Sequence, residues 1–580
     1  MRRIIEGQVS LALEQLKSDG VLPEDIPANF KVERPREKGH GDFATNAALV
    51  LCRLARMKPR DLAEKLIAAL PRGEAGAIER CEVAGPGFIN FFVATARLQK
   101  LVPEILEAGT AYGRSDSGQG KRVQVEFVSA NPTGPLHVGH GRGAVFGDVM
   151  ARLLTAVGCS VEREYYINDA GNQIDVLGHS VLHRYREVQG LPSHPPKESY
   201  PGEYVTRIAR ELYDRDGDRW LAESEPFAAP SDLPLPKPPR EVVDFAMEGV
   251  LADIRGDLEK MDIIFDSWFS ERSLHENNGI EVALDQLKAK ELIYEGVLER
   301  PKGLSEEESR DWQPRPQMLF RSTQFGDDVD RPLKKPDGGY TYFSADVAYH
   351  WHKAQRGFDQ LVNVWGADHG GYVKRVEAAL EALTGQKKRL DVKLVQLVNL
   401  TRGGKPVRMS KRAGTFVTLR EVIDEVGADA VRFWFLIRSG GARLDFDLDL
   451  AVSRSNDNPV FYVQYAHARV CSVWRQLKEK GLDAGGGDLS RLTATAELDL
   501  IRLLGTWPEV VEGAAAAHEP HRIPYYLLEL AGAFHVYYNG HRILDEDAGI
   551  RGARISLITA VRQVIANGLN LLGVTAPESM

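Results

Sequence analysis

The most constraining feature of this chain is a segment that passes from an apolar strand through a Pro/Gly turn into the start of a helix. Residues 125–128 have the pattern of a buried strand, and residues 131–135 are turn-forming. His137 and His140 then stand at the beginning of the helix. Because free backbone N–H groups gather at a helix N-terminus, an anion or a phosphate transition state is favoured there. The segment therefore predicts an α/β unit that binds a phosphate-bearing ligand.

Similar strand and helix patterns alternate further along the chain. The predicted elements of this core are strands at residues 122–128, 161–167, 360–365 and 392–400 and helices at residues 143–157 and 344–355. Strands separated by helices are typical of a parallel sheet that binds ligands at the carboxyl ends of its strands. The expected fold class is α/β, with a doubly wound, Rossmann-like sheet as the catalytic core.

A chain of 580 residues is too long for a single hydrophobic core, so flanking domains are expected. The predicted domains are an α+β domain at residues 1–118, the Rossmann-like domain at 119–448 with an insertion at about 187–315, and an all-helical domain at 449–580. Helical spacing covers 4–16 and 45–70, on either side of a Gly-rich turn at 39–46. The insertion holds a Pro-rich connector at 226–239 and a polar, exposed stretch at 301–316. A glycine run at 484–487 divides two helices of the last domain.

Charge and cysteine usage narrow the class of protein. Lys and Arg total 73 against 82 Asp and Glu, a net charge of −9, so a nucleic acid would have to meet local basic surface. The four cysteines stand far apart without a C-x-x-C pair, which suggests neither a zinc site nor a disulfide framework. The sequence has no uninterrupted apolar run of the roughly 18 residues that a membrane span needs. We expect a cytoplasmic protein that does not associate with a membrane.

The two histidines are the first candidate catalytic residues. Three positions apart at a helix start, His137 and His140 can face one ligand, and Gly139 leaves room for a flat base or a ribose. The alternative is a pair of ordinary helix-capping histidines, because an H-x-G-H pattern alone is weak evidence.

A second candidate lies in a Gly-rich, basic loop at residues 403–415. Such a loop can close over a triphosphate, where the Lys411 ammonium would neutralise departing pyrophosphate and Ser410 would offer a hydroxyl. The alternative is a basic surface turn in contact with solvent.

Together the two segments resemble the HIGH and KMSKS signatures of class I aminoacyl-tRNA synthetases, and their surroundings resemble the arginyl-tRNA synthetase family. Arg408 and Arg412 depart from the second signature, which has Lys and Ser there. The resemblance implies ATP as a substrate, Mg²⁺ as its cofactor, and no covalent change to an enzyme side chain. It implies catalytic roles for His137, His140 and Lys411, and ATP contacts at Pro132, Thr133, Gly134, His137, Gly139, His140, Met409, Ser410 and Lys411.

Two acidic side chains indicate which amino acid is the substrate. A guanidinium needs planar acceptors and at least one desolvated carboxylate. Glu126 on the strand and Asp346 at the start of a helix are candidates, although Asp346 could be a helix N-cap and Glu126 a salt bridge at a sheet end. A structural role is an alternative for His369. The family places arginine contacts at positions matching Ser129, Asn131, Tyr342, Asp346 and His369, to which we add Glu126.

The flanking domains carry the predicted contacts to tRNA. Residues 41–46 resemble the family's N-terminal additional domain, and residues 458–469 resemble the opening of its anticodon-binding domain. Aromatic faces there could stack on unpaired bases, or they could simply pack within the helical core. The candidate tRNA contacts are Phe43, Asn46, Tyr462 and Tyr465.

The resemblance implies ATP-dependent activation of L-arginine to arginyl-adenylate and transfer to the 3′-terminal adenosine of tRNA(Arg), by a monomer, with adenylate formation dependent on bound tRNA. One rival is a class I synthetase for another amino acid, such as glutamate or cysteine. The missing Cys/His metal set argues against cysteine, and Glu126 with Asp346 argues against an acidic substrate. The other rival is a non-catalytic tRNA-binding relative, against which the histidines and Lys411 argue.

Overall fold

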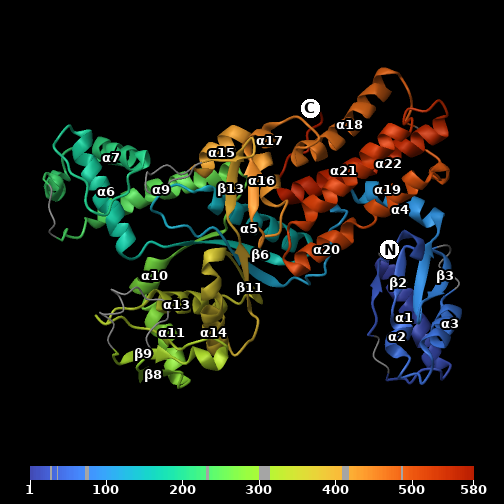
Figure 1. Ribbon diagram of the computed structural model, residues 1–580, viewed down its shortest axis with the longest axis horizontal. Helices are drawn as coiled ribbons and strands as arrows, with labels where there is room; N and C mark the ends of the chain where they lie inside the picture. Colours follow the sequence, from blue (N-terminus) through green and yellow to red (C-terminus); the bar gives the residue numbers. More distant parts are fainter. Residues whose placement is uncertain are drawn as a thin grey trace.

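The computed structural model describes residues 1–25, 29–35, 37–71, 77–229, 234–298, 314–407, 417–484 and 487–580. The N-terminal domain lies at one end of the molecule, next to the helical C-terminal part, and the parallel sheet lies between that part and α6 and α7 (Figure 1).

The N-terminal domain packs helices against a four-stranded antiparallel sheet with the order β1-β2-β4-β3. Helix α1 confirms the predicted helix at 4–16. The elements are α1 (Arg2–Ser18), β1 (Val32–Glu33), η1 (Lys38–His40), β2 (Phe43–Thr45), α2 (Ala47–Leu51), α3 (Pro59–Ala69), β3 (Ile78–Ala84), β4 (Phe88–Val93), α4 (Thr95–Ala108) and η2 (Gly109–Ala111).

Two predictions for this domain were wrong in detail. The helical stretch at 45–70 is two helices, because Arg56 has a positive φ of 51° and Pro59 begins α3. Proline suits the first helical turn, where its missing N–H leaves no hydrogen bond unmade. The Gly-rich turn at 39–46 also contains a strand, β2, since Phe43 and Thr45 both point into the core and pair with β4.

The central domain is built on a five-stranded sheet, all parallel, with the order β12-β11-β5-β6-β7. This confirms the predicted fold class. Because β5 has β6 on one side and β11 on the other, its carboxyl end is a point where the strand order reverses, which is where such sheets bind ligands. The elements are β5 (Arg122–Glu126), α5 (Val138–Ala156), β6 (Ser160–Ile167), α6 (Asn172–Val188), β7 (Ser267–Ser270), α13 (Tyr342–Gln355), β11 (Gln360–Gly366), η5 (Ala367–Tyr372), α14 (Val373–Thr384), β12 (Leu390–Val395), α15 (Leu419–Val426), α16 (Ala428–Phe435) and α17 (Leu448–Val452).

The predicted strand at 392–400 is wrong, because two strands occupy it. After β12 the chain leaves the main sheet at Gln396, whose N–H donates to the carbonyl of Gly440 and whose carbonyl accepts from Arg142. Strand β13 (Val398–Arg402) belongs instead to a small sheet with β14 (Lys405–Pro406) and β15 (Leu444–Asp447). A change of strand partner leaves no mark in apolar periodicity.

The region predicted as an insertion at 187–315 is only partly outside the core. Strand β7 falls within it and forms the edge of the main sheet beside β6. The polar stretch predicted at 301–316 lies outside the described residues up to position 313. The remaining elements between α6 and α13 are α7 (Glu203–Asp216), α8 (Leu221–Ser224), η3 (Glu225–Phe227), α9 (Arg240–Lys260), α10 (Glu271–Glu276), α11 (Gly279–Ala289), β8 (Ile293–Gly296), β9 (Gln317–Phe320), η4 (Ser322–Phe325) and β10 (Arg331–Pro332), the last three strands forming one sheet.

The C-terminal part is a helical bundle, as predicted. The glycine run at 484–487 lies between α18 and α19, with positions 485 and 486 outside the described residues. Helix α22 is long and apolar enough to cross a membrane, but 67% of its apolar window is buried within the protein, as in the core helix of a bundle. The elements are α18 (Pro459–Glu479), η7 (Leu489–Arg491), α19 (Thr495–Leu504), α20 (Trp507–Ala517), α21 (Arg522–Gly540) and α22 (Ala548–Leu572).

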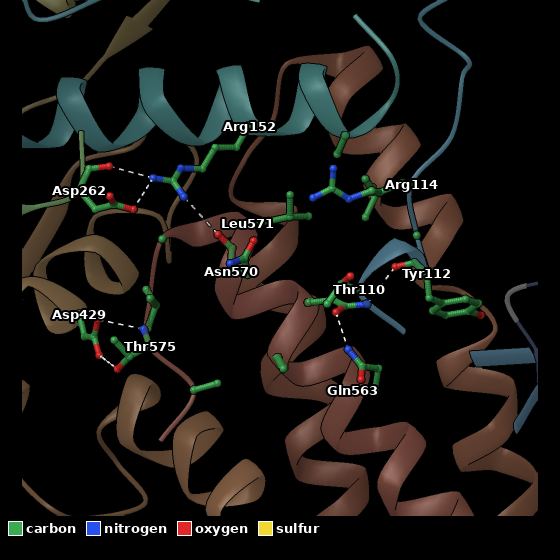
Figure 2. Close-up of a pocket in the computed structure, with 18 of the residues that line it drawn as sticks. Thr110, Tyr112, Arg114, Arg152, Asp262, Asp429, Gln563, Asn570, Leu571 and Thr575 are labelled. Atoms are coloured by element: carbon green, nitrogen blue, oxygen red, sulfur yellow. Dashed lines mark hydrogen bonds and ion pairs between the residues drawn. The ribbon is translucent and has the colours of Figure 1, made fainter. Parts of the chain in front are cut away.

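Charged side chains hold the bundle to the central domain. The buried Arg432 of α16 donates to the carboxylate of Asp148 on α5 and, at 2.6 Å, to the carbonyl of Leu572 at the end of α22. Beside them lies a cavity of about 810 Å³, in which Arg152 pairs with Asp262 and Thr575 donates to Asp429 (Figure 2). Because these polar groups satisfy one another across the junction, we regard this cavity as part of the domain contact and not as the reaction site.

Candidate active site

The histidine turn is a helix cap built from both imidazoles. His137 is the N-cap of α5, and its Nδ1 accepts from the N–H groups of Gly139 at 3.1 Å and His140 at 3.4 Å. The Nδ1 of His140 accepts in return from the N–H of His137 at 3.3 Å, and the two rings stack with centroids 3.6 Å apart. The capping alternative is therefore correct as geometry. It also orients both rings, which a ligand-binding role requires.

The protonation of the two rings suits them to donate hydrogen bonds to phosphate oxygens. Burial, together with the neighbouring ring of His137, lowers the pKa of His140 to about 3, so this imidazole is neutral at pH 7. Since each Nδ1 accepts a hydrogen bond, each ring carries its proton on Nε2, which is then a donor. The pair offers N–H donors next to the N-terminus of α5, and His140 does so in its neutral form.

The basic loop lies outside the described residues, but both of its ends are placed. Met409, Ser410 and Lys411 belong to the undescribed stretch 408–416. Where the description resumes, Thr418 forms a β-bridge with His137, and the N–H of Leu419 donates to the carbonyl of Leu136 at 2.8 Å. The loop therefore ends directly beside the histidine turn.

A tyrosine from α7 supports the turn before the histidines. The hydroxyl of Tyr204 donates to the carbonyl of Thr133 at 2.5 Å. A Cβ on residue 134 would lie 3.3 Å from the same hydroxyl, so the glycine at this position leaves room for the Tyr204 side chain. Pro132, the third predicted ATP contact of this turn, is buried. No motif near Tyr204 indicates a role at the turn, and only the fold brings α7 there.

The predicted arginine contacts meet in one cavity of about 370 Å³ at the carboxyl ends of β5, β6 and β11. They come from separate elements: the end of β5 and the loop after it, the first turns of α13, and η5. All six predicted residues line it, namely Glu126, Ser129, Asn131, Tyr342, Asp346 and His369. The lining residues that sequence reasoning missed include Tyr166, Asn168, Glu271, Tyr349, His350, Trp365 and Tyr372.

Two carboxyl groups of this cavity lack a strong counter-ion. Loss of water on burial raises the pKa of Asp346 to about 7 although the Tyr372 hydroxyl donates to its carboxylate, and burial raises the pKa of Glu271 to about 7. Among the described residues no Lys or Arg lies within ion-pair distance of either, and Glu271 has only His275 at 3.8 Å. Such a pair favours a cationic ligand, because a bound cation is what makes both ionised forms favourable.

The sequence predicted Asp346 as a site residue but not Glu271. Asp346 is not the helix N-cap that was the alternative for it, since Thr341 caps α13 and the carboxyl of Asp346 lines the cavity, where it accepts from Tyr372. Glu271 directly follows β7, so an acidic residue at the carboxyl end of a strand was a usable signal. It was missed because that region was assigned to an insertion.

Glu126 does line the cavity, but its charge is already compensated. Its carboxylate lies 2.5 Å from the ammonium of the fully buried Lys353 and accepts from the Ser129 hydroxyl at 3.1 Å. The salt-bridge alternative for Glu126 is therefore correct. Among the described residues, Asp346 and Glu271 are the cavity carboxylates without a Lys or Arg in ion-pair distance, and a guanidinium site formed by Glu126 and Asp346 stays a prediction.

The rim of the cavity is formed by more exposed side chains. Tyr342 is 65% exposed, and its ring lies 5.4 Å from the ammonium of Lys335. His369 is exposed, with its Nε2 3.5 Å from the carboxylate of Asp368. Asn131 donates to Gln173 at 2.7 Å. These groups can contact a bound ligand from the solvent side.

The predicted tRNA contacts divide into one error and three open cases. Phe43 is only 1% exposed and lies beneath the Arg34 guanidinium, so its ring belongs to the core and cannot stack on a base. Asn46 lines a hollow of about 650 Å³ together with Lys31, Arg34 and His40. The hollow combines cationic and amide side chains with the carboxylate of Glu33 on the surface of the N-terminal domain.

Tyr462 and Tyr465 are half-buried on α18. Their rings lie 4.7 and 5.7 Å from that of His535, and Arg469 stacks on Tyr465 at 4.5 Å. The ring of Tyr465 also stacks on that of Phe461, with centroids 5.8 Å apart. Both tyrosines therefore pack within the bundle, and stacking on a base stays a prediction.

Three family sequence profiles match three separate parts of the chain. They are the arginyl tRNA synthetase N terminal domain at residues 3–93, the tRNA synthetases class I (R) catalytic domain at residues 101–195, and the DALR anticodon binding domain at residues 463–580.

Full-length relatives and a solved structure agree. The chain is 58% identical to the arginine–tRNA ligase of Magnetococcus marinus, with 100% of both chains covered, and 50% identical to that of Ruegeria pomeroyi, with 99% of both covered. The arginyl-tRNA synthetase structure of Thermus thermophilus superposes with a TM-score of 0.74 at 22% identity, covering 100% of each chain, and this shows a shared fold.

Proposed function

This chain belongs to the arginyl-tRNA synthetase family, and from that premise we propose how its residues divide the work of the reaction. It is an arginine–tRNA ligase, which uses ATP to activate L-arginine as arginyl-adenylate and transfers arginine to the 3′-terminal adenosine of tRNA(Arg). The relatives favour this activity over a synthetase for another amino acid and over a non-catalytic tRNA-binding protein.

The guanidinium of arginine binds between Asp346 and Glu271. The observation that carries this assignment is that both carboxyl groups are held in a 370 Å³ cavity without a Lys or Arg partner among the described residues. A planar guanidinium can donate to two carboxylates at once, whereas an ammonium is a point charge. Tyr342 and His369 close the cavity from its rim.

The α-amino and carboxylate end of arginine lies near Glu126, Ser129 and Asn131. These residues stand at the end of β5 and in the loop that continues to the histidine turn. With the guanidinium at the α13 side of the cavity, the carboxylate is directed toward the histidines. The side-chain oxygens of Glu126 are acceptors for the α-ammonium group.

ATP binds along the turn and the start of α5, with contacts at Pro132, Thr133, Gly134, Gly139 and, from the basic loop, Met409 and Ser410. The arginine carboxylate attacks the α-phosphorus, a carboxylate–phosphorus bond forms, and the bond to pyrophosphate breaks. The Nε2 donors of His137 and His140 stabilise the charge that builds on the α-phosphate oxygens, and Lys411 neutralises the leaving pyrophosphate. A hydroxyl of the terminal adenosine then attacks the activated carboxyl and releases AMP.

Mg²⁺ has no protein-built site in the described part of the chain, which contains no group of three or more His, Cys, Asp or Glu side chains suited to a metal ion. Mg²⁺ commonly enters kinase-like sites on substrate phosphates with few protein ligands. We propose that it arrives with ATP, and no step above depends on a metal held by the protein.

For tRNA, Asn46 in the N-terminal hollow and Tyr462 and Tyr465 on α18 are the proposed contacts, the last two by stacking on anticodon bases. We further propose a cytoplasmic monomer in which adenylate formation requires bound tRNA. Robust arginine-dependent pyrophosphate exchange by the tRNA-free enzyme would refute the last point.

The assignment is tested by charging a tRNA pool with wild-type enzyme and with Asp346→Asn and Glu271→Gln. Each variant should raise the KM for arginine about ten- to hundredfold, the range for losing one charged partner, while the KM for ATP stays within about twofold. An unchanged arginine KM in both variants would remove these carboxylates from the pocket.

A further inference from the structure

A lysine with no exposed surface stands behind the arginine pocket. Lys353, on α13, has a side-chain exposure of 0%, and its ammonium lies 2.5 Å from the carboxylate of Glu126 and 2.9 Å from the amide oxygen of Asn363 on β11. The ring of Tyr349 lies 4.4 Å from the same ammonium. Lys353 does not line the cavity, but Glu126 and Tyr349 do.

From Lys353 a line of hydrogen bonds runs to the guanidinium end of the pocket. The amide of Asn363 donates to Nε2 of His350 at 2.9 Å, and Nδ1 of His350 donates to the backbone carbonyl of Asp346 at 2.8 Å. A ring whose Nε2 accepts a hydrogen bond while its Nδ1 donates one is a neutral imidazole. Burial, aided by the nearby Lys353 charge, lowers the pKa of His350 to about 3, which supplies that form.

In the other direction the line reaches the α-amino end. Glu126 accepts from the hydroxyl of Ser129 at 3.1 Å, and Ser129 in turn accepts from the N–H of Tyr166 on β6 at 3.2 Å. Ser129 has a positive φ of 42°, a conformation that costs energy in a non-glycine residue and that this pair of bonds holds in place. One buried ammonium thus connects both ends of the cavity.

The charges around Lys353 explain why a cation is needed there. The groups near Lys353 are Glu126 of β5, Glu164 of β6 with its partner Arg356, and two residues of its own helix, Asp346 and the neutral His350. Glu271, at the start of α10, lines the same cavity. Asp346 experiences Glu126 and Glu271 as repulsive charges and Lys353 as an attractive one. Three carboxylates at one small cavity cannot all be ionised without an internal cation.

We propose that Lys353 is a positioning residue for arginine recognition: its ion pair holds the carboxylate of Glu126 at the wall of the cavity, and its charge offsets the repulsion between Glu126 and Asp346, which leaves Asp346 available for the guanidinium. The inference rests on the proposed arginine site. Structural stability alone does not account for a charged residue here, because a buried ion pair is usually no more stable than apolar residues of similar size.

The test compares Lys353→Met with a matched control from the same helix. Arg356→Gln breaks a neighbouring ion pair, with Glu162 and Glu164, whose carboxylates do not line the cavity. Steady-state aminoacylation with tRNA(Arg) is measured from pH 6 to 9, varying arginine and ATP in turn. Thermal unfolding of each variant is recorded alongside.

Lys353→Met should raise the KM for arginine about ten- to hundredfold at pH 7 and leave the KM for ATP within about twofold. It should also move the fall of arginine KM with pH to higher pH, since Asp346 loses a nearby cation. Arg356→Gln should show neither effect. A purely structural role predicts lower thermal stability with an unmoved pH profile, and that result would overturn the inference.

The double variant Lys353→Met/Glu126→Gln removes both charges and protects the test from an unfolded single variant. Its pH profile should return close to that of the wild type, and its arginine KM should equal that of Glu126→Gln. Independent, multiplying effects of the two changes would contradict the inference. If Glu126→Gln and Asp346→Asn leave arginine KM unchanged, the proposed site itself fails; if they raise it and Lys353→Met does not, only the role of Lys353 fails.

Discussion

Single residues set the electrostatic character of the arginine pocket. Burial raises the pKa of Asp346 and that of Glu271 to about 7. Glu126, on the same wall, is matched by Lys353. The pocket therefore contains one carboxylate with a cationic partner and two that gain such a partner only when a cationic substrate binds. This is a physical basis for selecting arginine over neutral amino acids.

The first prediction concerns pH. Below pH 7 the raised pKa values leave Asp346 and Glu271 mainly protonated in the free enzyme, and a guanidinium binds the ionised forms. Arginine binding should therefore release protons, and the KM for arginine should fall as pH rises from 6 to 8. The KM for ATP should not follow, because His140, with a pKa of about 3, stays neutral over that range. Flat arginine KM values across this window would show that the two carboxyls do not face the substrate.

The sequence identified most pocket residues but misjudged their partners. Glu126 and Asp346 were found because each follows or precedes a recognisable strand or helix signal. Lys353 could not be found, since a lysine in an amphipathic helix pattern is normally read as solvent-exposed. Phe43 was misassigned because it was taken over from the resemblance of residues 41–46 to the family's N-terminal domain, and such a resemblance does not show which side chains point into the core.

At the scale of elements, the N-terminus of α5 is the best-defined part of the reaction site. The two imidazoles use Nδ1 to cap the helix and thereby direct Nε2 outward. Gly139 makes this cap possible, because a Cβ there would lie 2.9 Å from the ring of His137. The same helix contains Gly143, where a Cβ would meet nothing within 4 Å.

The second prediction uses this pair of glycines. Gly139→Ala should displace the His137 ring and lower kcat for aminoacylation about ten- to hundredfold, the range for losing one preorganised donor. Gly143→Ala should keep full activity and raise the free energy of unfolding by about 0.5–1 kcal/mol, because alanine is the better helix former. Equal kcat values for the two variants would separate the cap from catalysis.

Element boundaries were predictable where local signals were strong. Helices α1, α5 and α13 and strands β6 and β11 lie where periodicity placed them, to within a few residues. The division of 392–400 between two sheets and the membership of β7 in the main sheet were not predictable. Both depend on which distant strand supplies the hydrogen-bond partners, and period-2 alternation is the same for any partner.

At the scale of the whole molecule, the anticodon-side bundle is anchored to the reaction domain by buried charge. Arg432 of α16 reaches Asp148 of α5, the carbonyl of Met261 after α9, and the carbonyl of Leu572 in α22. Arg152 adds a second pair to Asp148. The side chain of Arg432 thus fixes the positions of α16, α5, α9 and α22 relative to one another.

The third prediction follows from this contact. Arg432→Met leaves Asp148 with one cation fewer and two carbonyls without a donor, so the free energy of unfolding should fall by about 3 kcal/mol. Charging should weaken through a raised KM for tRNA, since the bundle is held less firmly. The control, Arg402→Ala, breaks a solvent-exposed pair with Glu425 and should leave the unfolding midpoint unchanged. Equal stability of the two variants would show that the junction does not depend on Arg432.

By itself the sequence determined the α/β class of the catalytic core, the order of the functional segments and most residue types of the site, because these depend on local periodicity, turn chemistry and motif spacing. Only the tertiary structure decided which carboxylates stay unpaired, which lysine compensates Glu126, and that β7 brings Glu271 to the cavity. These outcomes depend on charged groups and strands that are far apart in the chain. The interaction free energy of a buried charge changes by several kcal/mol with the groups that lie next to it.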